Sequence, residues 1–424
     1  MKKTFLLSCL MLAAMPVMAA YTGHVYVDKN KNGVFDQSEK PLAGIKVSDG
    51  LNVVETAADG SFTLPGHERE RFIFITTPSG YKTFNRHYHK IEKKQSGYDF
   101  GLIPYSGRIR KDGSHRYIHI TDTEIFNTEN HADWVNNVHD YARNEQAAFI
   151  IHTGDLCYEK GLKAHIKLMN TENMDCPVFY CIGNHDLVKG KYGEELFESI
   201  YGPVYYSFDA GNVHYVVTPM PGGDHAPGYT SDDVCRWLKN DLAHIRPGTP
   251  VVVFNHDLLT YEDTFIFKSK NAGSINLNEY NLKAWVYGHW HINYMKKQGD
   301  VYSVCTSSLD KGGIDHSTTA FRVMHVDSKG DFTSELRYTY LDKNICIASP
   351  AGVMASGVLP VAVNVYSSVS PVREVLYTCL ADGKPVLKNK RLLQSTDWSW
   401  NGELPLSHKY VGKELTCLLY TSPS

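Results

Sequence analysis

The sequence lacks features that would place it in two large classes of proteins. Its 424 residues carry a net charge of only −3, and no block of lysine and arginine stands out. Because tight binding to a long nucleic acid requires many phosphates to be neutralised, no nucleic acid polymer is expected as a partner. Beyond the first twenty residues there is no apolar run long enough to cross a bilayer, so the rest of the chain is expected to lack a transmembrane segment.

Cysteine is also sparse and irregularly spaced. Of the nine cysteines, eight follow the first twenty residues, and their spacing fits neither a zinc site nor a dense disulfide framework. We therefore expect most of them to be small buried hydrophobic residues.

The first twenty residues have the pattern of a signal peptide. Lys2 and Lys3 form a basic start, Phe5 to Met15 is apolar, and Val17-Met18-Ala19 provides a cleavage site with small residues. The apolar stretch is too short to span a membrane comfortably. We expect residues 1–20 to export the protein to the periplasm, the cell envelope or the extracellular space.

The remaining chain divides into three regions. From residue 21 to 103, short apolar runs separated by Asp-Gly turns predict a β-sandwich. From 104 to 343, apolar runs ending in polar motifs alternate with helical patterns, which predicts an α/β domain. From 344 to 424, short β runs return and predict a β-rich domain. Its last eight residues match one reading frame of a common sequencing adaptor, so we expect this domain to be truncated.

Two helices are predicted in the α/β region, because apolar residues recur there on one helical face. The first is marked by Trp134, Val138, Tyr141 and Ala142. The second is marked by Val234, Trp237, Leu238, Leu242 and Ile245. We expect Ser231 to cap the start of the second helix.

Five polar motifs in this region each follow an apolar, strand-like run. In chain order they are Asp122-Thr123-Glu124, Gly154-Asp155, Gly183-Asn184-His185-Asp186, Asn255-His256-Asp257 and Gly288-His289-Trp290-His291. Carboxylates suit hard divalent ions and imidazoles suit borderline ones, so the mixture indicates Mn, Fe or Zn. Glycine beside the ligands lets backbone approach a crowded centre. His289 and His291 are expected to leave the same face of an extended segment.

The order and content of these motifs resemble the calcineurin-like metallophosphoesterase superfamily over residues 115 to 325. The resemblance implies a central four-layer αββα domain that hydrolyses a small phosphoester substrate. With the flanking β domains, the chain resembles secreted phosphoesterases of Bacteroidetes.

The same resemblance implies a centre with two divalent metal ions, bridged by Asp155. The first ion would be held by Asp122, Glu124 and His291. The second would be held by Asn184, His256 and His289. A metal-bridging hydroxide would attack phosphorus, and His185, held by Asp186, would protonate the leaving group.

Two positions leave alternatives open. The first motif usually ends in His, and here it ends in Glu124, which either ligates as a carboxylate and favours Mn or Fe, or points away and weakens the first site. If that site has lapsed, the protein would be a surface or envelope binding protein. Tyr158 matches a metal-binding tyrosine of purple acid phosphatases; in the alternative, it packs beside the ligands or supports them without binding a metal.

Further residues are candidates for the substrate pocket and for a second cation site. Two glycine-rich loops carry the pocket candidates Asp224, His225, Asp315 and His316. In the N-terminal region, one twelve-residue segment fits a calcium loop with strand-like flanks. Its expected ligands are Asp28, Asn30, Asn32, Val34, Asp36 and Glu39.

Overall fold

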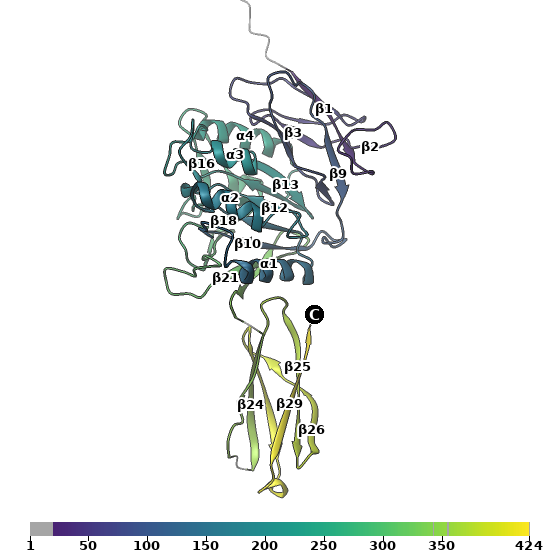
Figure 1. Cartoon of the computed structure of the whole chain (residues 1–424), viewed down its shortest axis with the longest axis vertical. Helices are drawn as coiled ribbons and strands as arrows, with labels where there is room; N and C mark the ends of the chain where they lie inside the picture. The colour runs from purple at the N-terminus through teal and green to yellow at the C-terminus, as the bar shows by residue number, and fades with distance from the viewer. Residues whose placement is uncertain (1–19, 342, 354–355, 424) are drawn as a thin grey trace, which may run out of the picture.

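The computed structural model describes residues 20–341, 343–353 and 356–423, arranged as a two-domain head with a β domain beneath it (Figure 1). Apart from its last residue, the predicted signal peptide lies outside the described residues. No helix of the described part of the chain is long and apolar enough to cross a membrane.

The N-terminal part of the head is formed by two small sheets. One sheet has the order β2 (Lys40–Pro41), β1 (Tyr21–Val27), β9 (Phe100–Pro104) and β7 (Tyr81–Thr83), with β5 (Ser61–Leu64) also paired to β1. The other has the order β4 (Val53–Glu55), β3 (Lys46–Ser48), β6 (Phe72–Ile75) and β8 (Tyr88–Lys90). Apolar residues of both sheets form a shared core, such as Val25 and Phe100 of the first sheet and Val47 and Ile75 of the second.

The larger part of the head contains two facing sheets. The first has the order β12 (Val178–Tyr180), β11 (Phe149–His152), β10 (His115–Ile120), β21 (Ala320–Val326) and β22 (Phe332–Tyr338). The second has the order β13 (Tyr206–Ala210), β14 (Val213–Val217), β15 (Val251–Phe254), β18 (Leu282–Tyr287), β20 (Val301–Cys305) and β19 (Tyr294–Gln298). A short hairpin, β16 (Ile266–Lys268) and β17 (Ser274–Asn276), lies outside them.

Aromatic rings fill the space between these two sheets. Tyr117 and Phe149 of the first sheet stack with centroids 4.7 Å apart, and Phe149 meets Tyr215 of the second sheet edge-on at 5.0 Å. Phe254 extends the same cluster, stacked on Tyr215 at 5.6 Å. All four side chains are buried, so this aromatic core joins the sheets over a large apolar area.

Helices cover the outer faces of both sheets, which gives the αββα order. The helices are α1 (Ala132–Asn144), α2 (Tyr158–Leu168), α3 (Glu195–Tyr201) and α4 (Ser231–Ala243), with 3₁₀ turns η1 (Asn184–Asp186) and η2 (Leu277–Tyr280). Trp134 and Val138 of α1 pack on Ile118 and Ile150 of the first sheet. The predicted fold class, a four-layer α/β domain flanked by β domains, is confirmed.

The two predicted helices form, with one correction. The buried residues of α1 are the predicted Trp134, Val138, Tyr141 and Ala142. In α4 the N-cap is Thr230, whose hydroxyl accepts a hydrogen bond from the backbone N–H of Asp233, and Ser231 is the first helical residue. Ile245 lies beyond the end of the helix and packs, partly buried, against the core.

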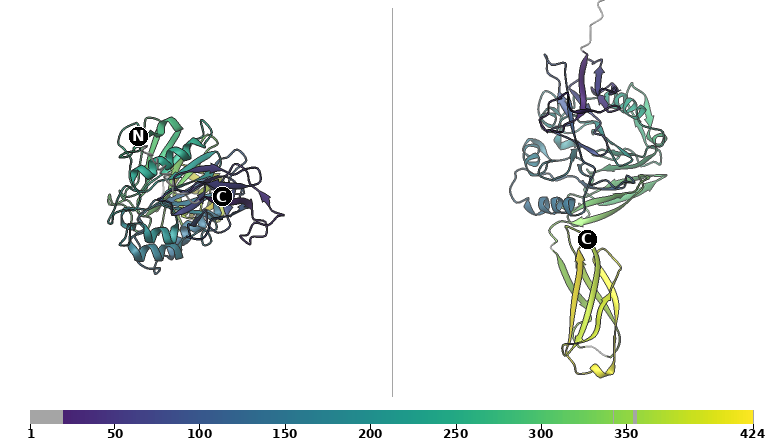
Figure 2. Two further views of the ribbon diagram at one scale, coloured as in Figure 1. Left: turned by 90° about the horizontal axis from the view of Figure 1, so that it is seen from above. Right: turned by 90° about the vertical axis from the view of Figure 1, so that its right-hand side faces the viewer.

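The C-terminal domain is a second β-sandwich that stands apart from the head in both side views (Figures 1 and 2). One sheet has the order β23 (Asn344–Ser349), β24 (Gly357–Tyr366), β28 (Ser399–Leu406) and β27 (Leu393–Gln394). The other has the order β26 (Lys384–Arg391), β25 (Val372–Ala381) and β29 (Leu415–Pro423), and a 3₁₀ turn, η3 (His408–Tyr410), precedes β29. Val363, Val375 and Trp400 are buried between the sheets.

Polar contacts fasten both β domains to the α/β domain. Arg71 of the N-terminal domain pairs with Glu194 at 2.8 Å and with Glu198 at 2.9 Å. At the other end, the hydroxyl of Tyr366 accepts a hydrogen bond of 2.7 Å from the backbone N–H of Tyr338. Six of the eight described cysteines are buried, while Cys346 is exposed and Cys417 half-buried.

Candidate metal centre

The predicted ligands follow the carboxyl ends of strands in both large sheets. Asp122, Asp155 and Asn184 follow β10, β11 and β12, which run parallel to one another. In the facing sheet, His256 follows β15 and His289 follows β18, again a parallel pair. Since parallel strands end at the same edge of a sheet, this topology brings the side chains of distant motifs together.

One group of side chains gathers around His291. Its Nε2 atom lies 3.3 Å from Oδ1 of Asp122 and 3.5 Å from Oε1 of Glu124. Glu124 is only one-fifth exposed, so its carboxylate faces the centre and not the solvent. These three residues are the ones expected to hold the first metal ion.

A second group gathers around His256. The ligand atoms of Asp155, His256 and His289 all lie within 4.8 Å of one another, and Nε2 of His256 is 3.1 Å from Oδ2 of Asp155. Asp155 also belongs to a set with Glu124 and His185 whose ligand atoms lie within the same limit. Asp155 therefore lies between the two groups, in the position expected of the bridging ligand.

Two buried polar atoms fit a cation at this place. Nδ1 of His256 lies 2.7 Å from the carbonyl oxygen of Thr153, so its N–H donates there and leaves the lone pair of Nε2 facing Asp155. Within the described residues, neither Nε2 of His256 nor Oδ1 of the Asn184 side chain has a hydrogen-bond partner. Both atoms are ordinary metal ligands, and a cation would satisfy them.

Electrostatics supports the same interpretation. Burial lowers the pKa of His256, but the charges of Asp155 and Asp122 outweigh this and raise it to about 10. Without a metal, a proton on the imidazole would balance the carboxylates. Metal binding would displace that proton, as expected for a ligand imidazole.

The backbone is held in an unfavourable conformation at five of the predicted ligands. The φ angles are 49° at Asp122, 44° at Glu124, 57° at Asp155, 64° at His289 and 51° at His291. Residues with a side chain rarely adopt this left-handed region. Residues in such conformations cluster at functional sites, where the direction of each side chain matters. The expectation that His289 and His291 leave an extended segment is wrong, because both lie in a tight left-handed turn.

Glycines allow the strand ends to approach this closely. A Cβ atom on Gly183 would lie 2.2 Å from Oδ1 of Asp155, and one on Gly288 would lie 2.6 Å from Oδ2 of Asp122. Both contacts are far shorter than a van der Waals contact. The glycines next to the ligands are therefore required by the packing of the centre.

His185 has a different partner from the one predicted. Its Nδ1 lies 2.8 Å from Oδ2 of Asp224, a residue singled out only as a pocket candidate. Asp186 is instead buried and accepts hydrogen bonds from the backbone N–H groups of Asp155, Cys157 and Gly183. Burial and the charge of Asp155 raise the pKa of Asp186. The prediction that Asp186 holds His185 is thus wrong, since its carboxylate is committed to the loops that carry the ligands.

Asp224 reaches His185 because its loop packs on the Asn184 motif. The backbone N–H of Asp224 donates to the carbonyl of Asn184 at 3.1 Å, and a Cβ on Gly223 would lie 2.7 Å from Cα of Asn184. The two glycines before Asp224 were the available signal in the sequence. His225, Asp315 and His316 are exposed on the two glycine-rich loops, so they remain pocket candidates.

Lys311 is a contact that the motif pattern does not reveal. Its Nζ lies 2.6 Å from Oε2 of Glu124, and it also donates to the Glu124 carbonyl. The same loop is tied to the centre by a hydrogen bond from the N–H of Ile314 to the carbonyl of His291. One oxygen of Glu124 thus faces an ammonium group while the other faces His291.

Tyr158 lies at the rim of the centre. Its side chain is 43% exposed, and its ring centroid is 5.2 Å from that of His185. The ring of Phe126, also exposed, lies nearly parallel to it at 6.4 Å. The two aromatic rings therefore flank the side of the centre on which His185 lies.

The predicted calcium loop is closed by its own oxygen atoms. The carboxylate of Asp28 accepts the N–H groups of Asn32 and Gly33, and that of Glu39 accepts those of Lys29 and Asp36. Gly33 has a φ of 73°, which provides the sharp turn expected at the sixth position. Three carboxylates, those of Asp28, Asp36 and Glu39, are thereby gathered in one loop.

Comparison with known protein families agrees with this geometry. The family model for the calcineurin-like phosphoesterase domain matches residues 115–293, which include all five motifs. The model for the N-terminal domain of calcineurin-like phosphoesterases matches residues 29–104. The chain belongs to the calcineurin-like phosphoesterases. The αββα domain is its phosphoesterase domain, and the first β-sandwich is the N-terminal domain found in members of the family.

Individual relatives are more distant. Purple acid phosphatase 13 of Arabidopsis thaliana is 26% identical over 215 residues, which cover 47% of this chain and 36% of that protein, so the match spans about a third of its length. Among solved structures, a putative 5′-nucleotidase from Staphylococcus aureus is 12% identical, with 53% of each chain covered and a TM-score of 0.31. An archaeal phosphodiesterase is 13% identical, with 52% of this chain and 99% of that chain covered and a TM-score of 0.27.

Proposed function

We propose that this protein is a secreted, metal-dependent phosphoester hydrolase with a dinuclear centre and a small phosphoester as its substrate. The observation that supports it most is the convergence of carboxylate and imidazole ligands on Asp155. Within the described residues, Nε2 of His256 accepts and donates no hydrogen bond and lies 3.1 Å from Oδ2 of Asp155. The calcineurin-like phosphoesterase family implies divalent metal ions, and the ligand types fit Mn, Fe or Zn.

In this proposal, Asp122, Glu124 and His291 hold one ion and Asn184, His256 and His289 hold the other, with Asp155 shared between them. When bound, the ions supply Lewis-acid stabilisation of the phosphoryl charge and lower the pKa of water. Thr153 keeps the Nε2 lone pair of His256 aimed inward, and Asp186 fixes the loops that carry Asp155 and Asn184.

His185 is proposed as the general acid. Burial lowers its pKa, but the hydrogen bond to Asp224 and the charge of Asp155 outweigh burial and raise it overall. The Nδ1–H of His185 donates to Asp224, which leaves Nε2 as the atom that gives a proton to the leaving oxygen. Asp224 acts here as a positioning residue that keeps the imidazole oriented and protonated.

The test is hydrolysis of p-nitrophenyl phosphate and bis-p-nitrophenyl phosphate. The protein is stripped of metal and reloaded with Mn²⁺, Fe²⁺, Zn²⁺ or Mg²⁺ in turn, alongside Asp155→Ala and Glu124→His. Asp300→Ala serves as the matched control, because this exposed carboxylate lies between β19 and β20, at the end of the sheet away from the metal centre.

The proposal expects activity to return with metal and to be lost in Asp155→Ala but not in Asp300→Ala. The preferred ester then narrows the substrate class. Failure of every metal with the native sequence, together with turnover by Glu124→His, would identify a lapsed first site and favour a binding protein of the cell surface or envelope.

A purple acid phosphatase-like centre is the second candidate, motivated by the Arabidopsis relative. It would require the hydroxyl of Tyr158 to bind ferric iron. A visible absorption band in the iron-loaded protein that vanishes in Tyr158→Phe would support it. If the band is absent while activity is unchanged in Tyr158→Phe, Tyr158 is a rim residue and not a ligand.

Export and calcium binding belong to the same proposal. The signal-peptide pattern of residues 1–20 supports a periplasmic, envelope or extracellular location. The loop from Asp28 to Glu39 is proposed to bind Ca²⁺ structurally, since its oxygen atoms occupy the positions of a twelve-residue calcium loop. N-terminal sequencing of the exported protein tests the first point, and an intact Met1 would contradict cleavage.

A further inference from the structure

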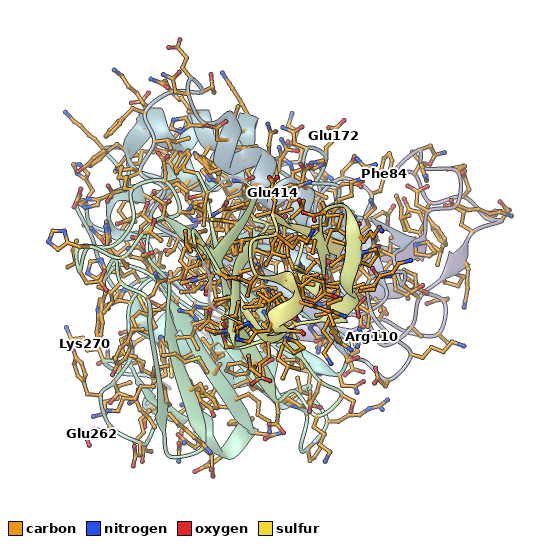
Figure 3. All side chains as sticks on the ribbon, turned by 90° about the horizontal axis from the view of Figure 1, so that it is seen from below. Phe84, Arg110, Glu172, Glu262, Lys270 and Glu414 are labelled. Atoms are coloured by element: carbon orange, nitrogen blue, oxygen red, sulfur yellow. The ribbon has the colours of Figure 1, made fainter. Side chains whose placement is uncertain are left out.

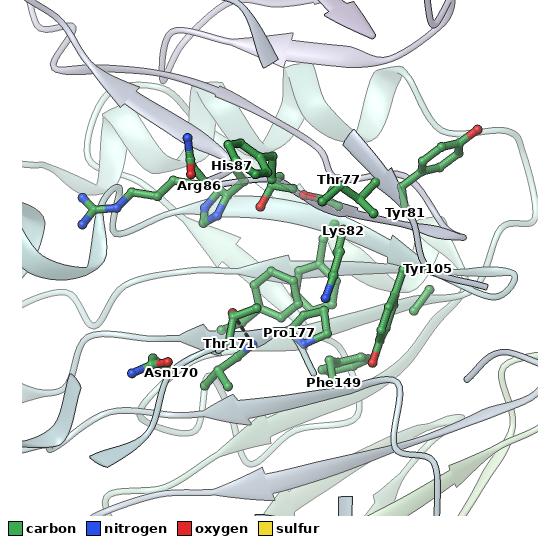
Figure 4. Close-up of a pocket in the computed structure, with 18 of the residues that line it drawn as sticks. Thr77, Tyr81, Lys82, Arg86, His87, Tyr105, Phe149, Asn170, Thr171 and Pro177 are labelled. Atoms are coloured by element: carbon green, nitrogen blue, oxygen red, sulfur yellow. Dashed lines mark hydrogen bonds between the residues drawn. The ribbon is translucent and has the colours of Figure 1, made fainter. Parts of the chain in front are cut away.

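A cavity of about 610 Å³ opens at the junction of the N-terminal domain and the phosphoesterase domain (Figure 4). Its floor includes Phe149 and Val178, at the amino ends of β11 and β12, whereas the metal centre lies beyond the carboxyl ends of the same strands. The cavity is therefore separate from the metal centre. Its size is in the usual range for small-molecule sites.

The floor of the cavity is aromatic. Phe179 and Phe208 stack with centroids 3.8 Å apart and planes within 11°, and Phe149 meets Phe179 edge-on at 5.9 Å. Pro177 lies beside them, near the centre of the view in Figure 4. Phe149 and Phe208 are themselves buried, whereas Phe179 and Pro177 are half-buried, so these two residues provide the apolar surface that the flat face of a ligand would contact.

The opposite wall, from the N-terminal domain, carries a histidine with an unused nitrogen. His87 packs its ring on Tyr206 at 4.6 Å and on Phe179 at 6.2 Å. Its buried Nε2 atom has no hydrogen-bond partner in the described part of the chain. Burial lowers the pKa of His87 to about 3, so the imidazole is neutral and can offer an N–H to an acceptor.

Lys82 supplies a positive charge to the same wall. Its side chain extends into the cavity in Figure 4, and its Nζ lies 5.2 Å from the ring centroid of Tyr105. Throughout the described residues its ammonium takes part in no ion pair. Arg86, by contrast, turns outward and donates to the hydroxyl of Tyr88 at 3.0 Å.

The acidic residues that line the cavity do not neutralise Lys82. Asp209 is bound to His214 at 2.6 Å and to Lys46 at 3.7 Å. Glu172 is exposed and lies near the edge of the molecule, as does Phe84 of the facing wall (Figure 3). Within the described residues, no carboxylate of the cavity lining therefore pairs with the ammonium of Lys82.

We propose that this cavity binds a small aromatic anion, with its ring on the phenylalanine floor, its acidic group at Lys82 and an acceptor atom facing Nε2 of His87. An aromatic ring would bury the apolar surface of the floor, and a single negative charge would pair with the ammonium of Lys82. An acceptor atom would take the hydrogen bond that Nε2 of His87 lacks. The site does not depend on the proposed hydrolytic activity.

The test is binding of naphthalene-2-carboxylate to the metal-loaded full chain, measured by isothermal titration calorimetry. Naphthalene-2-carboxamide is the matched neutral ligand. Lys82→Met removes the charge but keeps the stem of the side chain, and Lys93→Met, an exposed lysine of the same domain, is the matched control. Thermal melts of both variants verify that they fold.

The carboxylate is expected to bind with one-to-one stoichiometry, at least roughly tenfold more tightly than the carboxamide, as for a hydrogen bond to a charged group. Lys82→Met should remove that preference, while Lys93→Met should keep it. Equal binding of the two ligands, binding unchanged in Lys82→Met, or no binding of the carboxylate would each overturn the proposal. Replacing His87 by Phe provides a second readout, because it should weaken the carboxylate without abolishing the charge preference.

Discussion

Asp224 and His185 face each other across 39 residues of sequence, with Nδ1 of the imidazole 2.8 Å from the carboxylate oxygen. This contact holds the pKa of His185 above its usual value, although burial alone would lower it. Asp186, the neighbour of His185 in the chain, is turned away to bind backbone. If His185 is the general acid, as proposed above, the loop of residues 221–225 contributes to the acid–base chemistry through Asp224.

Asp224→Asn is expected to lower the pKa of His185. Because the proposed general acid acts in its protonated form, the alkaline limb of the pH–rate profile should move to lower pH, and kcat at neutral pH should fall roughly tenfold. The profile is measured with p-nitrophenyl phosphate. Asp300→Asn, in the exposed turn between β19 and β20, is the control. An unshifted alkaline limb in Asp224→Asn would mean that His185 is not the acid.

Lys311→Met is expected to tighten the first metal site. The ammonium neutralises the Glu124 carboxylate at 2.6 Å, so its removal frees a ligand oxygen. For a partly exposed ion pair worth about 1 kcal/mol, the metal dissociation constant should fall roughly fivefold. Calorimetric titration of the stripped protein with Mn²⁺ measures it. Glu124→Gln should weaken the binding of Mn²⁺. Weaker binding of Mn²⁺ by Lys311→Met would argue that Glu124 is not a ligand.

The stability of the phosphoesterase domain is expected to fall between pH 6.5 and 9. His214 is buried, with Nδ1 2.6 Å from Asp209 and Nε2 2.8 Å from Asp241. Burial lowers the pKa of His214, but the two carboxylates outweigh this and raise it to about 9, above the unfolded value of about 6.5. The protonated imidazole of His214, held between the two carboxylates, therefore stabilises the fold fully below pH 6.5. This contribution to the free energy of unfolding, about 3 kcal/mol, is lost as the pH rises through 9.

Urea unfolding followed by tryptophan fluorescence at pH 6, 7.5 and 9 measures this dependence. His214→Gln should be less stable at pH 6 and should lose most of the slope. The exposed His408→Gln is the control and should keep it. A wild-type midpoint that does not change over this range would contradict the assignment.

Calcium is expected to stabilise the N-terminal domain. At a free concentration one hundred times the dissociation constant, binding to the folded state alone contributes about 2.7 kcal/mol. EDTA should therefore lower the melting temperature of this domain, and Asp28→Ala should abolish the response. Glu68→Ala, an exposed carboxylate of the same domain, should respond like the native protein. A melt that is identical in calcium and in EDTA would exclude the site.

The sequence predicts much of the frame because each ligand motif directly follows an apolar run. The buried face of α1 is the predicted one, and α4 forms over the second predicted helical pattern. Parallel strands bring their carboxyl ends together whatever the loops do. Local patterns therefore place each motif at the end of a strand, and the family resemblance implies that the motifs meet in one centre.

The contacts between loops could not be predicted in this way. Asp224 contacts His185, and Lys311 contacts Glu124. Both contacts depend on the course of a loop, and hydrophobic periodicity does not predict the course of loops. The left-handed backbone at Asp122 and His289 is a conformation that non-glycine residues adopt uncommonly, and no pattern in the sequence marks it. The cavity near Lys82 and His87 arises from the packing of two domains, and neither domain's sequence pattern contains it.

The division of the ligands between two sheets has a mechanical consequence. Asp122, Asp155 and Asn184 follow strands of one sheet, and His256, His289 and His291 follow strands of the other. A bound ion would therefore be coordinated from both sheets and would connect them at this end of the domain. At the opposite end the halves are held by the rings of Phe149 and Tyr215. Removal of the metal should accordingly loosen the contact between the sheets at the metal end only. Amide hydrogen exchange should become faster around Gly154 and Gly288, while the amides near Phe149 and Tyr215 stay protected.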